Sequence, residues 1–255
     1  MTTKKFAGQV AIITGAGQGI GFEIARQMAL DGASVLINDI NEKLIKEAAD
    51  GINSTGGNCI ALAGDAADID FIQQMVDLAV ERFGKLTIAI ANAGITLFGD
   101  FLTYPAASLQ SVMNLNLQGS FFLAQKAAQQ IIKQHSGGSI LFMSSVTGHQ
   151  AHKDLAAYGM TKAALEMLAK NLVIELSPYH ITVNTVAPGA TLTERTLEGA
   201  DYKSTWSRIT PMGRPATVAD VANAVTFLTS PASGHITGQN IIVDGGWTAV
   251  STSPY

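Results

Sequence analysis

Short apolar segments alternate with longer segments of mixed polarity along almost the whole chain. The short segments are nearly continuous apolar runs, which is typical of strands that are covered on both faces in a parallel sheet. We therefore predict seven strands, at Val10–Thr14, Ser34–Asp39, Ile60–Ala63, Leu86–Ala91, Ser139–Met143, Ile181–Val186 and Ile241–Val243.

The longer segments carry apolar residues at helical spacing, as in the stripe of Leu165, Leu168 and Leu172. This alternation predicts one α/β domain over residues 1–255: a Rossmann-type, doubly wound, parallel seven-stranded sheet with helices on both faces. Helices are expected at Gly21–Asp31, Asn41–Ser54, Asp70–Phe83, Ser108–His135 and Ala157–Leu176. A region at about 191–215 fits neither pattern, and we expect a long irregular segment there that serves as a substrate lid.

Composition narrows the class of protein. The 255 residues are 47% hydrophobic, which is enough for one buried core, and the formal net charge is −4 without any block of like charges. Neither nucleic acid nor an anionic membrane is indicated as a partner. No uncharged apolar run approaches the roughly 18 residues of a membrane span, and the N-terminus has no secretory signal. With Cys59 as the single cysteine no intrachain disulfide can form, so we expect a soluble cytoplasmic protein with a buried thiol.

A glycine-rich turn follows the first predicted strand, with glycines at positions 15, 17, 19 and 21. Glycines let the backbone turn tightly and approach a pyrophosphate, and the N-terminus of the following helix then offers free N–H groups to it. The spacing is not the strict G-x-G-x-x-G pattern, and a tight turn without a ligand is the alternative. The strand before the turn and the helix after it favour a dinucleotide site.

Acidic and amide side chains follow the next strands. Asp39 ends the second strand, where a carboxylate would accept hydrogen bonds from an adenosine ribose and repel the 2′-phosphate of NADP. We therefore predict NAD as the cofactor; the alternative is that Asp39 only caps the next helix. Asp65 could accept a hydrogen bond from the adenine amino group, and Asn92 and Gly94 follow the fourth strand near the expected crevice.

Tyr158 and Lys162 are one helical turn apart, downstream of the strand that delivers Ser145. Such residues share one face of a helix. A tyrosine normally loses its proton near pH 10, which is too high for an efficient base at neutral pH. A cation about 4 Å away, at an effective dielectric constant of about 20, stabilises a phenolate by on the order of 4 kcal/mol. The pair therefore predicts proton transfer by Tyr158, with Ser145 holding the alcohol or carbonyl oxygen. A tyrosine and a lysine four residues apart also occur by chance, so the prediction depends on the glycine-rich turn found earlier in the same chain.

Together these features resemble the short-chain dehydrogenase/reductase family, from about Phe6 to Asp244-Gly245-Gly246. The matching positions include the turn Thr14–Gly21, Tyr158 and Lys162, and also Asp65, Asn92, Gly94, Asn116, Ser145, Asn184, Pro188 and Gly189. Thr87 and Ala91 depart from the family pattern, where Asp and Asn are frequent, and we expect altered local packing at both.

The resemblance implies catalytic roles for Asn116, Ser145, Tyr158 and Lys162. Lys162 would also bind the nicotinamide ribose, and Asn116 would hold a helix kink and a water that relays protons. The cofactor-binding residues would be Gly15, Gln18, Gly19, Ile20, Asp39, Asp65, Ala66, Asn92, Gly94, Tyr158, Lys162, Pro188, Gly189, Thr191 and Thr193. The helices at 108–135 and 157–176 would pack against partner subunits in a homotetramer; that both are core helices of one subunit is the alternative.

The substrate pocket implied by the resemblance is polar with a few aromatic residues. It comprises Ile95–Leu97, residues 146–154, residues 193–195, Tyr202 and Trp206. It favours a sugar or polyol, and the wider pattern resembles bacterial sugar dehydrogenases of the glucose 1-dehydrogenase kind; exposure of these side chains to solvent is the alternative. His149 and His152 lack partners for a metal site, so none is expected.

Two other functions remain open. The first is a 3-oxoacyl-[acyl-carrier-protein] reductase; those enzymes mostly use NADPH, so Asp39 argues against it. The second is a nucleotide sensor without turnover, which the intact Ser145, Tyr158 and Lys162 argue against. The expected protein is thus an enzyme, a nicotinamide-dependent alcohol dehydrogenase or ketone reductase that prefers NAD.

Overall fold

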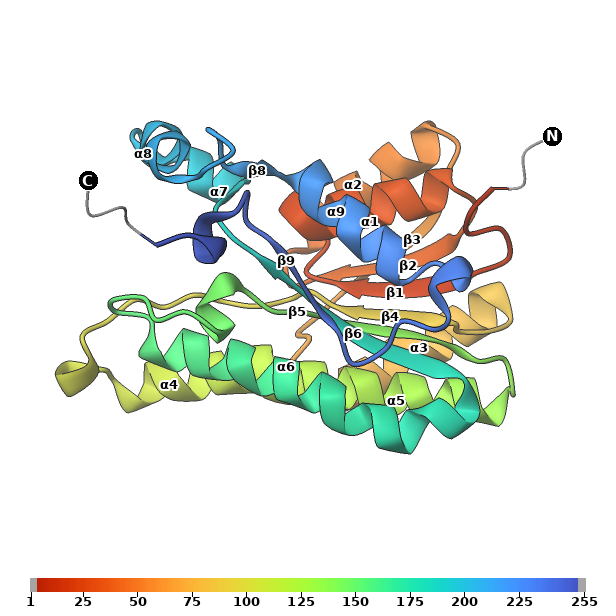
Figure 1. Cartoon of the computed structure of the whole chain (residues 1–255). Coiled ribbons are helices and arrows are strands. Elements are labelled where there is room, and N and C mark those ends of the chain that lie inside the picture. Colours follow the sequence, from red (N-terminus) through yellow and green to blue (C-terminus); the bar gives the residue numbers. More distant parts are fainter. Residues whose placement is uncertain (1–3, 252–255) are drawn as a thin grey trace.

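Seven parallel strands form one sheet in the computed structural model, in the order β3-β2-β1-β4-β5-β6-β9 (Figure 1). The structure describes residues 4–251, so both ends of the predicted domain 1–255 lie outside the described residues. The predicted sheet is confirmed, and its strands differ from the expected ones only at their ends. They are β1 (Val10–Thr14), β2 (Ser34–Asp39), β3 (Asn58–Ala63), β4 (Ile88–Ala91), β5 (Gly138–Met143), β6 (Ile181–Pro188) and β9 (Asn240–Val243).

Helices cover both faces of this sheet. One face carries α1 (Gly19–Leu30), α2 (Glu42–Ser54) and α9 (Val218–Leu228), and the opposite face carries α3 (Ile69–Phe83), α5 (Ser120–Lys133) and α6 (Ala156–Leu176) (Figure 1).

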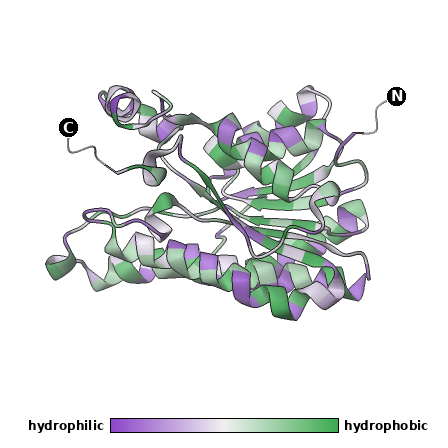
Figure 2. Ribbon diagram, in the orientation of Figure 1, coloured by the Kyte–Doolittle hydropathy of each residue, from purple (hydrophilic) through white to green (hydrophobic). Residues whose placement is uncertain are grey.

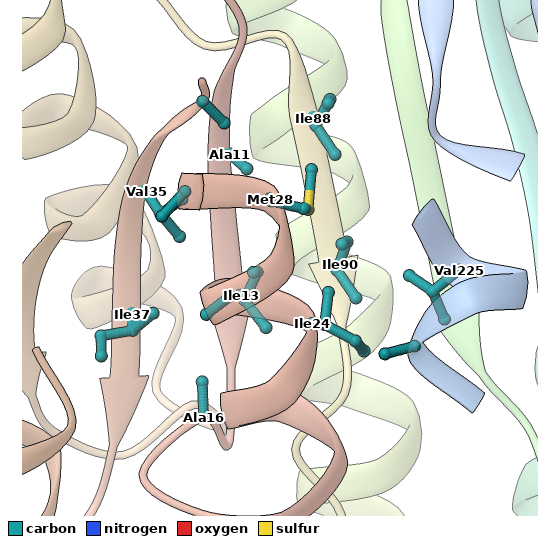
Figure 3. Close-up of a cluster of buried hydrophobic side chains, with 14 of the residues drawn as sticks. Ala11, Ile13, Ala16, Ile24, Met28, Val35, Ile37, Ile88, Ile90 and Val225 are labelled. Carbon is teal, nitrogen blue, oxygen red and sulfur yellow. The ribbon is translucent and has the colours of Figure 1, made fainter. Parts of the chain in front are cut away.

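Alternate residues of β1 point to the two sides of the sheet. Ala11 and Ile13 pack under α1 and α9 with Ile24 and Val225 (Figure 3), whereas Ile12 lies in the core on the other side. The apolar colouring concentrates accordingly in the sheet and on the helix faces turned toward it (Figure 2).

Thr87, one of the two departures from the family pattern, is buried immediately before β4. Its hydroxyl accepts a hydrogen bond of 3.0 Å from the Val10 N–H and donates one of 3.1 Å to the Val10 carbonyl. The Thr87 hydroxyl therefore satisfies both backbone polar groups of Val10 at the start of β1.

The predicted helix 108–135 is one continuous helical run of three parts. It begins with α4 (Ala106–Val112), continues through a π-helical turn, η2 (Met113–Gly119), and ends with α5. Asn116 lies within η2, where its carbonyl accepts a 2.7 Å hydrogen bond from the Ser120 hydroxyl. A π-helical turn is the kind of irregularity that the resemblance implied at Asn116.

The region 191–215 is not the irregular segment that its sequence predicts. It contains β7 (Thr191–Leu192), α7 (Glu194–Leu197) and α8 (Tyr202–Ile209), and β7 pairs with β8 (Ala216–Thr217) outside the main sheet. These elements are too short to show a hydrophobic period. The side chains of Thr193 and Thr196 form a capping box at the start of α7.

Within residues 4–251, no helix combines the length and the apolar composition needed to cross a lipid bilayer.

Candidate active site

The glycine-rich turn between β1 and α1 packs directly against the end of β4. Gly15 has φ +61°, and a Cβ there would lie 2.8 Å from the Cα of Ala93. At Gly21 a Cβ would collide with the carbonyl oxygen of Gly15 and with the amide of Asn92. Only glycine fits at either position, so the turn is held close to β4.

Asn92, which directly follows β4, binds the backbone of this turn. Its side-chain amide donates hydrogen bonds of 3.0 Å to the Thr14 carbonyl and 2.8 Å to the Gly15 carbonyl. Helix α1 above the turn has no acidic residue in its first turn, and Gln18 at its N-cap makes no side-chain cap bond. The first N–H groups of α1 are therefore left for an anionic ligand.

Asp39 lies at the carboxyl end of β2, beside the turn. Its Oδ2 accepts a 3.2 Å hydrogen bond from the Gly17 N–H, and its Oδ1 accepts one of 3.1 Å from the Asn41 N–H. Asn41, whose side chain accepts from the Leu44 N–H, is the N-cap of α2. Asp39 is therefore not the capping residue of that helix.

A cavity of about 250 Å³ opens beside Asp39, and we call it the β2 cavity. Its lining contains two carboxylates and no basic side chain: Gly15, Asn38, Asp39, Ile40, Gly64, Asp65, Ala66, Ala93, Gly94, Ile95 and Leu115. The expected residues for the adenosine part of a cofactor thus lie together.

A second cavity, of about 220 Å³, shares Gly94 with the first, and we call it the active-site cavity. It brings together ten of the predicted site residues, namely Ile20, Asn92, Gly94, Ser145, Tyr158, Lys162, Pro188, Gly189, Thr191 and Thr193. They come from both halves of the chain, since parallel strands end at the same edge of the sheet.

Tyr158 and Lys162 lie one turn apart on α6, as predicted. The Lys162 Nζ is 5.4 Å from the centre of the Tyr158 ring and donates a 2.8 Å hydrogen bond to the Met143 carbonyl at the end of β5. The Lys162 side chain is buried, and no carboxylate lies within ion-pair distance of it among the described residues. The Lys162 ammonium therefore lies between the end of β5 and the ring of Tyr158.

Ser145 follows β5, is buried and lines the same cavity. Its hydroxyl oxygen accepts a 3.3 Å hydrogen bond from the Thr147 N–H as it caps the short turn η3 (Val146–Gly148). The Ser145 O–H proton is left to donate toward the cavity.

Asn116 is wholly buried behind Gly94. Its amide donates to the Ile95 carbonyl (2.9 Å), and its Oδ1 accepts from the Ile95 N–H (2.8 Å). A Cβ at Gly94 would lie 3.2 Å from that Oδ1 and 3.4 Å from the Lys162 Nζ. Asn116 therefore fixes the segment after β4 and borders the site beside Lys162 without lining the cavity.

Arg195 and Tyr202, from the region 191–215, also line the active-site cavity. Burial raises the pKa of Tyr202 above its ordinary value, although the Thr191 N–H and the charge of Arg195 partly oppose this. The lining includes the cations Lys162 and Arg195 and no carboxylate.

Several predicted pocket residues lie elsewhere. His149, His152 and Trp206 line neither cavity. Trp206 packs edge-to-face on Trp247 at 5.1 Å, and His152 lies 5.3 Å from the same ring. Gln18 is exposed at the start of α1. Across residues 4–251, no group of three or more His, Cys, Asp or Glu side chains is arranged to hold a metal ion.

Sequence reasoning missed three residues of the active-site cavity, namely Met143, Ser144 and Thr196. Met143 contacts Lys162 through its backbone carbonyl, and the residue type at a position does not predict such a backbone contact. Ser144 does have a signal, because it is the first polar residue after a buried strand and directly precedes Ser145.

Comparison with known proteins gives matches over nearly the whole chain. A protein-family model described as Enoyl-(Acyl carrier protein) reductase matches residues 15–248. The chain is 35% identical over 251 residues to a diacetyl reductase ((S)-acetoin forming) from Staphylococcus epidermidis, covering 93% of this chain and 98% of that protein. It is 35% identical over 247 residues to an L-rhamnose 1-dehydrogenase (NAD(P)(+)) from a Sphingomonas species, covering 95% and 97%.

A solved structure agrees with these matches. The crystal structure of a short-chain type dehydrogenase/reductase from Mycobacterium marinum superimposes with a TM-score of 0.92 at 33% identity, covering 97% of this chain and 98% of that one.

Proposed function

The chain belongs to the short-chain dehydrogenase/reductase family, and on this premise we propose that it is an NAD-dependent oxidoreductase that interconverts a secondary alcohol or hemiacetal hydroxyl and the corresponding carbonyl compound. The observation that carries the proposal is the shared cavity of Ser145, Tyr158 and Lys162, bordered by the residues expected to hold nicotinamide.

The residues present fit a dinucleotide. Glycine at positions 15 and 21 lets the turn pack against Ala93 and Asn92, and the N-terminus of α1 has free N–H groups that could bind a pyrophosphate. Gly15, Gln18, Gly19 and Ile20 would hold the pyrophosphate, and Pro188, Gly189, Thr191 and Thr193 would hold the nicotinamide end. When bound, the dinucleotide supplies or accepts the hydride.

The proton chemistry belongs to the chain's own side chains. In the oxidative direction the phenolate oxygen of Tyr158 takes the hydroxyl proton of the substrate, and in the reductive direction the phenol returns it. The Ser145 hydroxyl donates a hydrogen bond to the substrate oxygen and orients it. Lys162, whose Nζ lies 5.4 Å from the centre of the Tyr158 ring, would bind the nicotinamide ribose.

Asp39 supports NAD rather than NADP. The β2 cavity holds two carboxylates and no cation to receive a 2′-phosphate. The Asp39 carboxylate, which accepts hydrogen bonds from the Gly17 and Asn41 N–H groups, would repel that phosphate.

A sugar or polyol is the proposed substrate class. Hydroxyl groups from Thr96, Ser145 and Tyr202 line the active-site cavity. The relatives act, by their names, on a small dicarbonyl compound and on a sugar. Both kinds of substrate are consistent with a small polar cavity.

We also propose that the protein is a homotetramer and that it is located in the cytoplasm. A groove of about 620 Å³ between the η2–α5 run and α6 is lined mainly by apolar groups, and Phe121 and Met167 within it are 41% and 56% exposed. Apolar side chains that are exposed together on neighbouring helices are expected of an association surface.

The test is NADH formation by the purified protein over a panel of aldoses, polyols and simple secondary alcohols, with NADP⁺ in parallel. Turnover with NAD⁺ supports the proposal. If no compound of the panel is oxidised but the protein reduces a β-ketoacyl ester with NADPH, the alternative of a 3-oxoacyl-[acyl-carrier-protein] reductase is established. That result would contradict both the proposed substrate class and the proposed role of Asp39.

A further inference from the structure

Glu166 lies one turn beyond Lys162 on α6 and contacts the segment that carries Ser145. Its Oε1 accepts a 2.7 Å hydrogen bond from the Ser144 hydroxyl, and the Nδ1 of His149 lies 3.4 Å from the same oxygen. One carboxylate oxygen thus contacts the residue immediately before Ser145 and a residue four positions after it.

We propose that Glu166 is a positioning residue of the active site, which locks the Ser145 segment onto the helix that carries Tyr158 and Lys162. The inference rests on the proposed function, in which Ser145 and Tyr158 must hold the same substrate oxygen. These two side chains belong to different elements, so their relative position depends on the contacts between α6 and residues 143–149.

The contacts between these elements form a short ladder along α6. Tyr158, Lys162 and Glu166 follow one another at intervals of four residues and therefore share one helix face. The Lys162 Nζ binds the Met143 carbonyl, and the Ser144 hydroxyl lies 3.2 Å from the Lys162 carbonyl as well as 2.7 Å from Glu166. Glu166 supplies the last rung of this ladder.

Close packing shows how little freedom the contact leaves. A Cβ at Gly148 would lie 2.8 Å from the Glu166 Oε1, 3.0 Å from the Ser144 Oγ and 3.1 Å from the Ala163 N. The turn that Ser145 caps is therefore pressed against α6 at the point where Glu166 binds it.

The charge of Glu166 strengthens the anchor. Its side chain is 15% exposed, and within residues 4–251 His149 is the one basic side chain within ion-pair distance. Hydrogen bonds to a charged group are worth more than neutral ones, especially where water has little access.

Three variants test the anchor: Glu166→Ala, Glu166→Gln and Ser144→Ala, with Glu175→Gln on the exposed side of α6 as a matched control. Misplacing a reacting group by about 1 Å can cost on the order of a hundredfold in rate. We expect Glu166→Ala to lower kcat about tenfold to a hundredfold, with the Kd for NADH unchanged within twofold. Glu166→Gln, whose amide oxygen still accepts from Ser144, restores most of the rate.

The loss of rate in the double variant Ser144→Ala/Glu166→Ala should be smaller than the combined losses of the two single variants, because the two changes share one contact. Additive losses, or a loss confined to NADH binding, would overturn the inference. So would an unchanged kcat in Glu166→Ala.

Amide hydrogen exchange of residues 145–150 gives a readout that needs no turnover. Glu166→Ala should speed exchange there at least tenfold and leave the rest of the sheet unchanged. If exchange in residues 145–150 is unchanged in Glu166→Ala, the anchor is refuted, even if the substrate panel finds no activity. If the wild-type protein is inactive but Glu166→Ala still speeds exchange in this segment, the anchor stands and only the proposed function is refuted.

Discussion

The backbone N–H of Thr191 donates a 3.2 Å hydrogen bond to the phenol oxygen of Tyr202. This bond joins the strand that leaves the active-site cavity to the helix that covers it. A residue that the resemblance assigns to nicotinamide is thus held directly by α8.

Tyr202→Phe should weaken NADH binding about twofold to tenfold, because a single neutral hydrogen bond is worth about 0.5–1.5 kcal/mol. Fluorescence titration with NADH measures the effect. Trp206, which stacks on Tyr202 at 6.1 Å, offers an internal probe of lid position. An unchanged Kd and an unchanged tryptophan signal would show that the bond does not restrain the lid.

Tyr158→Phe should abolish turnover while NADH still binds. General acid/base catalysis contributes about a hundredfold to ten-thousandfold, and phenylalanine can neither take nor give the proton. Single-turnover kinetics and NADH titration separate the two properties. Tyr179→Phe, at an exposed tyrosine between α6 and β6, is the control. Substantial residual activity in Tyr158→Phe would exclude Tyr158 as the proton-transfer residue.

Asp39→Asn should shift cofactor preference toward NADP⁺ by about tenfold or more in kcat/KM. The change removes the repelling charge but keeps an oxygen that can accept from the Gly17 N–H. Initial rates with both cofactors at matched substrate concentration provide the ratio. If the wild-type protein already uses the two cofactors equally, Asp39 does not select NAD.

Arg195 should favour substrates that carry a carboxylate, because the active-site cavity has two cations and no acidic lining. Gluconate should compete for the site better than sorbitol, a neutral polyol with the same number of carbons. Arg195→Gln should reduce that difference severalfold, whereas Arg208→Gln on α8 should not. Equal inhibition by both compounds in the wild-type protein would contradict this prediction.

Stability should depend on pH through Asp220, near the start of α9. Hydrogen bonds from Arg214 hold the pKa of Asp220 well below its usual range, despite partial burial. Because the folded pKa is depressed, the stabilisation is fully present above the unfolded value of about 3.9 and is lost as the pH falls below it.

The matching variant is Asp220→Asn. Urea unfolding at pH 7 should find it less stable than the wild-type protein, and the gap should narrow between pH 5 and pH 3. A gap that stays constant across this range would exclude the charge of Asp220 as the cause.

The sequence predicts the features that depend on a short stretch of chain and misses those that depend on contacts between distant segments. Local apolar runs predict the strands, and the four-residue spacing of Tyr158 and Lys162 predicts that they share one helix face. The edge-to-face contact of Trp206 with Trp247 joins segments that no local sequence pattern relates. Helices α7 and α8 were missed because four and eight residues are too few to establish a period. The role of Met143 was hidden because a backbone carbonyl is common to all residue types.

The tight fit at Gly148 constrains how this protein can change over evolutionary time. Any side chain at position 148 would enter the space of the Glu166 carboxylate. A larger residue there becomes tolerable only after position 166 has become smaller, and the order of the two substitutions matters. Among homologues we expect the two positions to vary together, so that a bulky residue at 148 is found with a small one at 166.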